Sequence, residues 1–363
     1  SGKTAIAGEF LKHLQGSGVF IVDELTLLEQ SRLEIARVTG EAIGIIGRGE
    51  FQPQRVTCAT VQTLYLHAAR RDFRLWARKL HVMIIDEIHV CLNNRQRKVL
   101  DAIRPPAVFG LTATLQLQRR NVLMQATALA GAVIFEFPLA TATKQAFLTP
   151  GIVVQIEHPT VMLSSRKESW SESYRQLTAD AERNRLIEQL ARAALAAGRA
   201  VIILAEWVAH VDRLSAQLRD VVHCCVLGRV DSATRLQAKH DFDAGRIRLI
   251  IANRVFSKGV DIRKVDVIID ATAGRNPNGA LQRYGRGVRL AEQKTGLLYL
   301  DIADHNNRFA SSAKARSLAW RRAGVQIYRA SSSRGATKII DQALKQLCFR
   351  YNTFESQKIT KRA

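Results

Sequence analysis

The first four residues, Ser1-Gly2-Lys3-Thr4, have the residue types of a loop that binds a triphosphate. In such a loop the backbone N–H groups cradle phosphate oxygens at the start of a helix, and a lysine reaches the terminal phosphates. Lys3 is placed for that role, and the hydroxyl of Thr4 is placed to ligate a magnesium ion. Taken alone, the same four residues also fit an ordinary helix start capped by Ser1.

Two carboxylates, Asp86 and Glu87, follow the apolar run at residues 82–85. That run predicts a buried parallel strand, so both side chains should emerge at the carboxyl edge of a sheet, where open α/β sheets bind ligands. Asp86 suits the coordination shell of magnesium. Glu87 is placed to orient or deprotonate a water that attacks the γ-phosphate. With Lys3 and Thr4 upstream, these residues predict a site for ATP and Mg2+.

A second basic segment, at residues 282–289, reads Gln-Arg-Tyr-Gly-Arg-Gly-Val-Arg. Arg286 and Arg289 could each neutralise charge that develops on the γ-phosphate during hydrolysis. If these arginines and Lys3 contact one nucleotide, the site lies in a cleft between two domains, and ATP closes that cleft. The alternative interpretation of the segment is an exposed basic loop.

The composition points to a polyanionic partner. Lysine and arginine number 54 against 32 aspartates and glutamates, which gives a formal net charge of +22. Nucleic acid is the first candidate partner and an anionic membrane surface the second. No segment reads as a long apolar span or a basic amphipathic anchor, which disfavours the membrane. Five scattered cysteines without metal-ligand spacing indicate reduced core thiols in a cytoplasmic protein.

Short apolar, β-branched runs alternate with helical stretches in both halves of the chain, the pattern of parallel sheets covered by helices. At 363 residues the chain is long enough for two domains. We therefore expect an α/β fold with domain 1 over residues 1–147 and domain 2 over residues 181–330. A polar stretch with Pro150 and Pro159 predicts a connection over residues 148–180. The expected strands cover residues 19–22, 56–59, 82–85, 108–111, 201–204, 249–252, 267–269 and 297–300.

The two ends of the chain carry further expectations. Residues 331–363 form a basic extension in which Ile340, Leu344, Leu347 and Tyr351 follow helical spacing. We expect this helix to dock on domain 2, the alternative being an arm that binds nucleic acid. At the other end, a phosphate loop normally follows a strand and begins with a glycine. We therefore expect that this strand and the first loop residues are missing from the sequence.

In their order and spacing, these segments resemble the motifs of superfamily 2 helicases and translocases of the DExH type. Motif I corresponds to residues 1–4 and motif II to residues 86–89, which read Asp-Glu-Ile-His. The other correspondences are motif Ia at residues 23–30, Ib at 57–64, III at 112–114, V at 252–262 and VI at 282–289. The resemblance implies two tandem RecA-like domains with ATP in the cleft between them and a nucleic-acid strand lying across both.

The resemblance also assigns roles by position. It implies that His89, Thr112 and Thr114 couple the state of the nucleotide to domain closure, and that Gln282 joins the catalytic group beside the γ-phosphate. The residues implied to hold the nucleotide are Ser1, Gly2, Lys3, Thr4, Gly259 and Asp261. The residues implied to contact the sugar-phosphate backbone are Gln30, Thr60, Gln62 and Ser257.

Within the superfamily, the form of motif VI is closer to phage and bacterial DNA helicases of the UvsW-like and excision-repair types. DNA is therefore favoured over RNA as the partner, in the bacterial nucleoid or in the cytoplasm of a phage-infected host. Three alternatives stay open: an RNA helicase, a nucleic-acid-binding scaffold without turnover, and the motor subunit of a restriction or nuclease complex.

Overall fold

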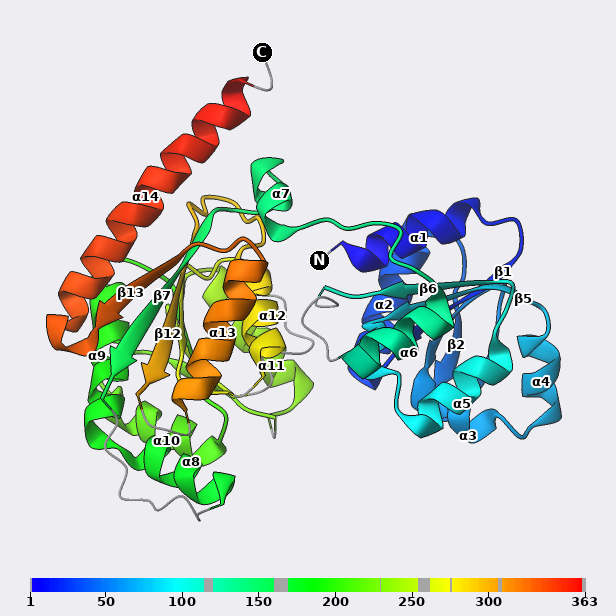
Figure 1. Cartoon of the computed structure of the whole chain (residues 1–363), viewed down its shortest axis with the longest axis horizontal. Helices are drawn as coiled ribbons and strands as arrows, with labels where there is room; N and C mark the ends of the chain where they lie inside the picture. The colour runs from blue at the N-terminus through cyan, green and yellow to red at the C-terminus, as the bar shows by residue number, and fades with distance from the viewer. Residues whose placement is uncertain are drawn as a thin grey trace. The chain divides into compact units, whose positions relative to one another are not determined.

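The computed structural model describes residues 2–113, 120–159, 169–228, 230–253, 262–274, 276–305 and 309–360. The chain divides into two compact units, residues 1–136 and residues 137–363, and each is described by itself (Figure 1). No helix in these ranges is both long and apolar enough to cross a bilayer.

The first unit is built on a six-stranded sheet with the order β3-β2-β4-β1-β5-β6. Every neighbouring pair is parallel except β2 and β3. The strands are β1 (Ser17–Val22), β2 (Gly44–Gly47), β3 (Glu50–Gln52), β4 (Val56–Thr60), β5 (Leu80–Asp86) and β6 (Ala107–Leu111). The helices are α1 (Lys3–His13), α2 (Leu25–Thr39), α3 (Val61–His67), α4 (Arg71–Ala77), α5 (Asn94–Ile103) and α6 (Arg120–Ala130).

The central strands of this sheet are apolar on both faces because helices cover both. Phe20 and Val22 of β1 pack with Leu11 of α1 and with α2 on one face. Val19 and Ile21 point to the opposite face, which α3, α4, α5 and α6 cover. A strand buried on both faces reads as a continuous apolar run, which is why these strands were predictable from the sequence.

The second unit contains a seven-stranded, fully parallel sheet with the order β13-β7-β12-β11-β8-β10-β9. Its strands are β7 (Gly151–His158), β8 (Val201–Leu204), β9 (Cys224–Val226), β10 (Leu249–Ala252), β11 (Val267–Asp270), β12 (Leu297–Asp304) and β13 (Ile327–Ser331). Its helices are α7 (Leu139–Lys144), α8 (Trp170–Ala179), α9 (Ala181–Ala196), α10 (Val208–Gln217), α11 (Ser232–Asp243), α12 (Pro277–Gly287), α13 (Ala310–Arg322) and α14 (Ala336–Thr360). Helices α9, α10 and α14 cover one face of the sheet, and α12 and α13 pack against the other.

The predicted connection over residues 148–180 differs from the structure. Residues 151–158 form β7, which pairs in parallel with both β12 and β13 inside the second sheet. Pro150 and Pro159 flank this strand, so they mark its two ends and do not indicate a linker. Helix α8 also belongs to the second unit, which begins at Phe137.

The C-terminal extension forms the long helix α14. Ile339, Ile340, Ala343 and Leu347 are buried in the same apolar core as α9 and the strands of the second sheet. The first half of α14 is therefore part of the second unit, as its helical spacing predicted.

Candidate nucleotide site

Lys3 lies against the two predicted carboxylates at the carboxyl edge of the first sheet. Its Nζ forms an ion pair with Glu87 Oε1 and lies 3.6 Å from Asp86 Oδ1. All three side chains are only 16–21% exposed. Lys3 and Asp86, 83 positions apart in the sequence, meet because α1 begins beside the carboxyl end of β5.

The backbone on both sides of this contact adopts the left-handed conformation. Gly2 precedes α1 with φ 75° and ψ −9°, a conformation that glycine adopts without the steric cost of a Cβ atom. Glu87 has φ 46° and ψ 51°, which is unusual for a residue with a side chain. Its amide donates to Asp86 Oδ1 at 3.0 Å. Such backbone strain is concentrated at functional sites, and here it turns the Glu87 carboxylate toward Lys3.

His89 and Thr112 complete a polar cluster around Glu87. His89 Nδ1 lies 3.0 Å from Thr112 Oγ1 and 3.4 Å from Glu87 Oε2. The Thr112 hydroxyl also donates to Glu87 Oε2 at 3.3 Å. Thr112 follows β6, so the cluster joins the carboxyl ends of two neighbouring strands. A change at the Glu87 carboxylate can therefore reach the end of β6 through these contacts.

Burial sets the protonation tendencies of this cluster. Burial raises the pKa of Asp86 above its usual value, while the positive charge of Lys3 opposes that shift. Burial lowers the pKa of His89 below 6.5, against the attraction of Glu87. His89 is therefore neutral at pH 7, and only one of its ring nitrogens then carries a proton.

The oxygen donors present at this edge fit a magnesium ion bound together with a nucleotide. Thr4 is half-buried in the first turn of α1, and Asp86 is half-buried at the end of β5. Mg2+ prefers oxygen ligands and usually takes its remaining ligands from phosphates and water. Among the described residues, no group of three or more His, Cys, Asp or Glu could hold a metal alone. The donor set therefore suits Mg2+ that arrives with ATP.

Among the residues predicted to contact nucleic acid in the first unit, Gln30 and Gln62 are exposed. Gln62 Nε2 donates to the carbonyl of Asp23, directly after β1, at 2.6 Å.

The side chain of Thr60, in contrast, is buried and only 1% exposed. The Thr60 hydroxyl accepts from the amide of Thr63 and caps α3, so it is occupied inside the unit. The structure thus gives the Thr60 side chain a structural role in place of the predicted contact.

In the second unit, α12 carries the predicted Gln282 and Arg286, and Arg289 follows two residues after the helix ends. All three side chains are half-buried. Sequence reasoning missed Arg283, the neighbour of Gln282, whose Nη2 donates to Asp270 Oδ2 at 2.7 Å. The signal for this pair is weak, since an aspartate that ends an apolar strand does not indicate which arginine will reach it.

Several predicted residues lie outside the described part of the chain. These are Ser1, Thr114, Ser257, Gly259 and Asp261. Their roles stay predictions, and most of motif V is among them.

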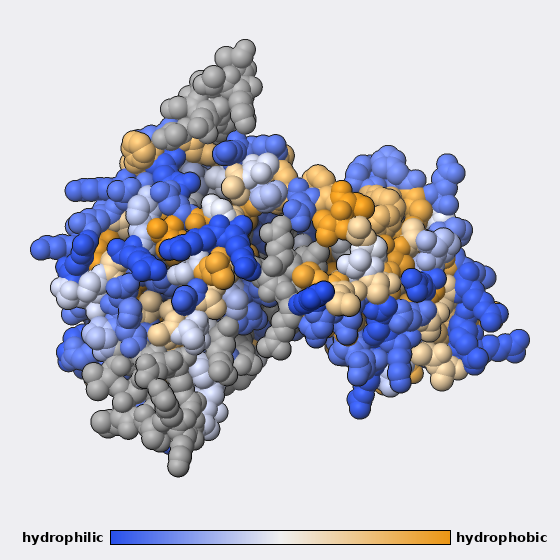
Figure 2. Space-filling model, viewed as in Figure 1, coloured by the Kyte–Doolittle hydropathy of each residue, from blue (hydrophilic) through white to orange (hydrophobic). Residues whose placement is uncertain are grey.

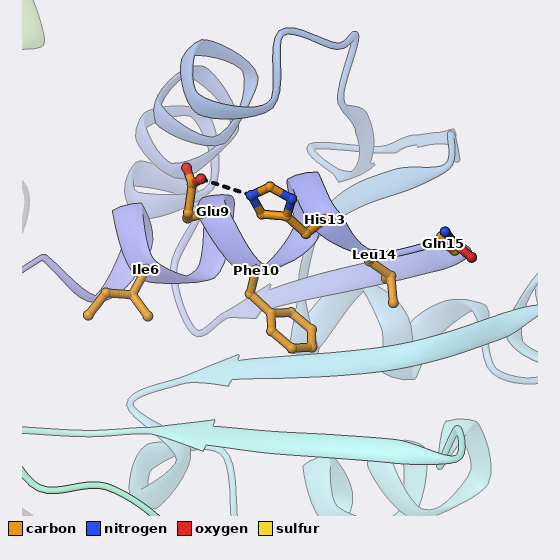
Figure 3. A pocket seen from close by; sticks show the side chains of 6 residues that line it. All are labelled: Ile6, Glu9, Phe10, His13, Leu14 and Gln15. Atoms are coloured by element: carbon orange, nitrogen blue, oxygen red, sulfur yellow. Dashed lines mark hydrogen bonds and ion pairs between the residues drawn. The ribbon is translucent and has the colours of Figure 1, made fainter.

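An apolar groove of about 590 Å3 lies beside α1, and none of its lining residues belongs to the carboxylate cluster (Figure 3). It is lined by Ile6, Glu9, Phe10, His13, Leu14 and Gln15. The Phe10 ring contacts Phe109 of the edge strand β6, with ring centroids 5.1 Å apart. Apolar side chains gather over α1 on the visible face of the first unit (Figure 2). The groove has no arrangement of polar groups that would suit a triphosphate.

Comparison with known families supports the fold. Residues 1–117 match the model of the type III restriction enzyme res subunit, and residues 182–291 match the helicase conserved C-terminal domain. These two matches, together with two largely parallel α/β sheets, support a superfamily 2 helicase with RecA-like domains.

Individual relatives agree with this class. The chain is 28% identical over 96 residues to the ATP-dependent RNA helicase eIF4A of Schizosaccharomyces pombe, which is 26% of this chain and 24% of that protein. The match to the ATP-dependent RNA helicase drs1 of Neurospora crassa is 29% over 90 residues and covers 25% of this chain and 11% of the relative. The chain thus spans a quarter or less of the length of these relatives.

Two solved structures share the fold. Dbp5 of Saccharomyces cerevisiae bound to RNA and ADP BeF3 has a TM-score of 0.64 at 15% identity, covering 96% of this chain and 86% of that chain. Helicase Lhr of Mycobacterium smegmatis bound to ssDNA and AMP-PNP has a TM-score of 0.53 at 20% identity, covering 91% and 46%.

Proposed function

We propose that the chain hydrolyses ATP with Mg2+ and uses the energy to translocate along, or unwind, a nucleic acid. The observation that carries this proposal is the contact of Lys3 with Asp86 and Glu87, backed by His89 and Thr112. Lys3, Asp86 and Glu87 suit the roles of phosphate-binding lysine, metal-binding carboxylate and general base in phosphoryl transfer to water.

The residues of this cluster have separate tasks in the proposed reaction. Lys3 leaves Glu87 and binds the β- and γ-phosphates when ATP arrives. Glu87, freed from Lys3, accepts the proton of the attacking water or orients that water. Thr4 and Asp86 hold Mg2+, which when bound neutralises charge on the phosphate oxygens. His89 and Thr112 transmit the change at Glu87 to the end of β6.

We further propose that Gln282, Arg286 and Arg289 complete the site when the two units close on ATP. Each arginine would neutralise charge on the γ-phosphate in the transition state. Alternate closure and opening, with each unit holding phosphates of the nucleic-acid backbone, would move the protein along one strand. The roles implied for Thr114, Ser257, Gly259 and Asp261 belong to the same proposal.

The net charge of +22 favours a nucleic acid without distinguishing DNA from RNA, and we favour DNA on the form of motif VI alone. The curated relatives named above are RNA helicases and do not support this preference. RNA is therefore the alternative substrate. A restriction-complex motor is a second candidate function, which the match of residues 1–117 to a restriction-enzyme subunit favours.

The test measures phosphate release with and without single-stranded DNA, duplex DNA and RNA, followed by strand displacement on forked substrates. We expect nucleic acid to stimulate ATP hydrolysis and DNA to stimulate it more than RNA. ATP hydrolysis that no nucleic acid stimulates would contradict the proposed function. Equal or greater stimulation by RNA would contradict only the preference for DNA.

A further inference from the structure

The loop that leads from β11 toward α12 is held by buried arginines from two other helices. Residues 271–274 follow the end of β11. Arg183 of α9 donates from Nη2 to the carbonyl of Ala271 at 3.0 Å. Arg316 of α13 donates from Nη1 to the carbonyl of Gly274 at 2.9 Å. The two ends of this short loop are therefore bound by side chains that lie 133 positions apart.

A third arginine reaches the middle of the loop from α12 itself. Arg283 Nη2 lies 3.4 Å from Thr272 Oγ1 and donates to Asp270 Oδ2 at 2.7 Å. The amide and hydroxyl of Thr272 both donate to Asp270 Oδ1, at 3.0 and 2.6 Å. Asp270 also accepts from the Tyr299 hydroxyl. Asp270 thus ties the loop and the helix to the same carboxylate.

Each arginine is anchored by an aspartate of a strand. Arg183 forms a double contact with Asp304, at 2.8 and 3.1 Å. Arg316 Nε donates to Asp301 Oδ1 at 2.9 Å. Both aspartates belong to β12, the neighbour of β11. The guanidinium groups of Arg183 and Arg316 therefore each bind both an aspartate of β12 and a carbonyl of the loop.

The ion pairs of Arg183 with Asp304 and of Arg316 with Asp301 are buried. Arg183, Arg316, Asp301 and Asp304 are each no more than 1% exposed. Burying ion pairs costs desolvation energy, and apolar residues of similar volume are often as stabilising. What the ion pairs supply in addition is directional contact, because the guanidinium is planar and its donors are fixed.

The backbone of the loop adopts an unfavourable conformation at Ala273. Ala273 has φ 47°, in the left-handed region that disfavours residues with a Cβ atom, and it is 2% exposed. Such a strained conformation persists only where surrounding contacts determine it. The three arginines bind the residues on both sides of Ala273, and Ala273 itself packs with Tyr174, Leu177 and Phe309.

We propose that Arg183, Arg283 and Arg316 form a three-arginine clamp that positions α12, and with it Gln282, Arg286 and Arg289, for ATP hydrolysis. This inference rests on the proposed function of those three residues. The clamp residues are positioning residues, since they act through the loop and the helix. Small misplacements of catalytic groups can cost on the order of a hundredfold in rate, so a rigid approach to α12 has a catalytic consequence.

The test uses Arg316→Lys and Arg183→Lys in the full chain. Lysine keeps the charge opposite Asp301 or Asp304 but lacks the planar fork that also reaches the loop carbonyl. We expect kcat for nucleic-acid-stimulated ATP hydrolysis to fall about tenfold or more, with KM for ATP changed less than about threefold. Lys3, the residue proposed to bind the phosphates, belongs to the other unit, so ground-state binding of ATP should be spared.

Leu190→Ala is the matched control for lost stability. Leu190 lies fully buried on α9, the helix of Arg183, and contributes to the core on the side of the sheet away from α12. Its truncation should lower the free energy of unfolding, because it removes buried apolar contacts and leaves a cavity. At a temperature well below its unfolding midpoint, this variant should keep the wild-type kcat. A wild-type kcat in both lysine variants, or an equal loss in Leu190→Ala, would overturn the clamp.

Hydrogen exchange separates failure of the clamp from failure of the proposed function. In the wild type, the amides of residues 271–273 should exchange as slowly as those of β11, and in the lysine variants they should exchange at least about tenfold faster. This readout needs no ATP hydrolysis. Fast exchange of these amides in the wild type would refute the clamp, whether or not the lysine variants fold. A wild-type chain without ATPase activity would refute the proposed function alone.

Discussion

Replacing Glu87 by glutamine should have two opposite effects, abolishing turnover while tightening the binding of ATP. In the structure Glu87 Oε1 forms an ion pair with Lys3. Lys3 is the residue expected to bind the β- and γ-phosphates, so ATP competes with Glu87 for the same ammonium group. Glutamine keeps the shape of the side chain and removes the charge that competes.

The size of the binding effect follows from the exposure of the pair. Lys3 and Glu87 are 17% and 21% exposed, between a solvated surface pair and a fully buried one. We assign the pair about 1 kcal/mol, the upper end of the range for exposed ion pairs. Removing that competition corresponds to about a fivefold lower Kd for ATP. Loss of the group that activates water should lower kcat by about 10²–10⁴-fold.

The assay combines equilibrium binding of a fluorescent ATP analogue with Mg2+ and measurement of phosphate release. Glu9→Gln is the control, because Glu9 is a 58% exposed carboxylate on α1 whose loss changes the net charge of the first unit equally. The control should leave both Kd and kcat unchanged. Weaker binding in Glu87→Gln than in the wild type, or undiminished hydrolysis, would refute the reasoning.

Three further predictions concern other parts of the molecule. Burial lowers the pKa of His210 to about 3, so below pH 6.5 the unfolded chain binds a proton that the folded chain does not. The free energy of unfolding should therefore fall by about 2 kcal/mol from this group between pH 7.5 and pH 5, and urea titrations should show a smaller fall in His210→Gln. Arg286→Ala should lower kcat about 10³-fold or more with a small change in ATP affinity, and an unchanged kcat in phosphate release would exclude the arginine from the reaction. Thr60→Val should cost about 1 kcal/mol through loss of the α3 cap and leave nucleic-acid affinity unchanged, whereas Gln62→Ala should weaken binding in a titration. If Thr60→Val weakens nucleic-acid binding by more than the smaller fraction of folded protein explains, the predicted contact of Thr60 with the sugar-phosphate backbone is supported.

Local patterns in the sequence were sufficient for the strands that lie inside the sheets. The apolar run ending at Asp86 is buried in β5, and the run at residues 201–204 is β8. Burial on both faces leaves an unbroken apolar signature that needs no knowledge of the partner strands. The same local reasoning placed Asp86 and Glu87 at a carboxyl edge, and the structure brings Lys3 to them. Phosphate-binding loops have this predictable local chemistry because the helix start and the lysine are adjacent in sequence.

Tertiary structure alone decided the features that depend on distant residues. The prolines around β7 indicated a linker until the pairing of β7 with β12 and β13 was known. The hydroxyl of Thr60 is occupied by the cap of α3, which its motif did not indicate. Arg183 and Asp304 form an ion pair although they are 121 positions apart, and no periodicity or spacing in the sequence predicts it. Hydrophobic periodicity is a property of one segment, whereas a buried ion pair is a property of how several segments pack, so only packing reveals which charges are desolvated together.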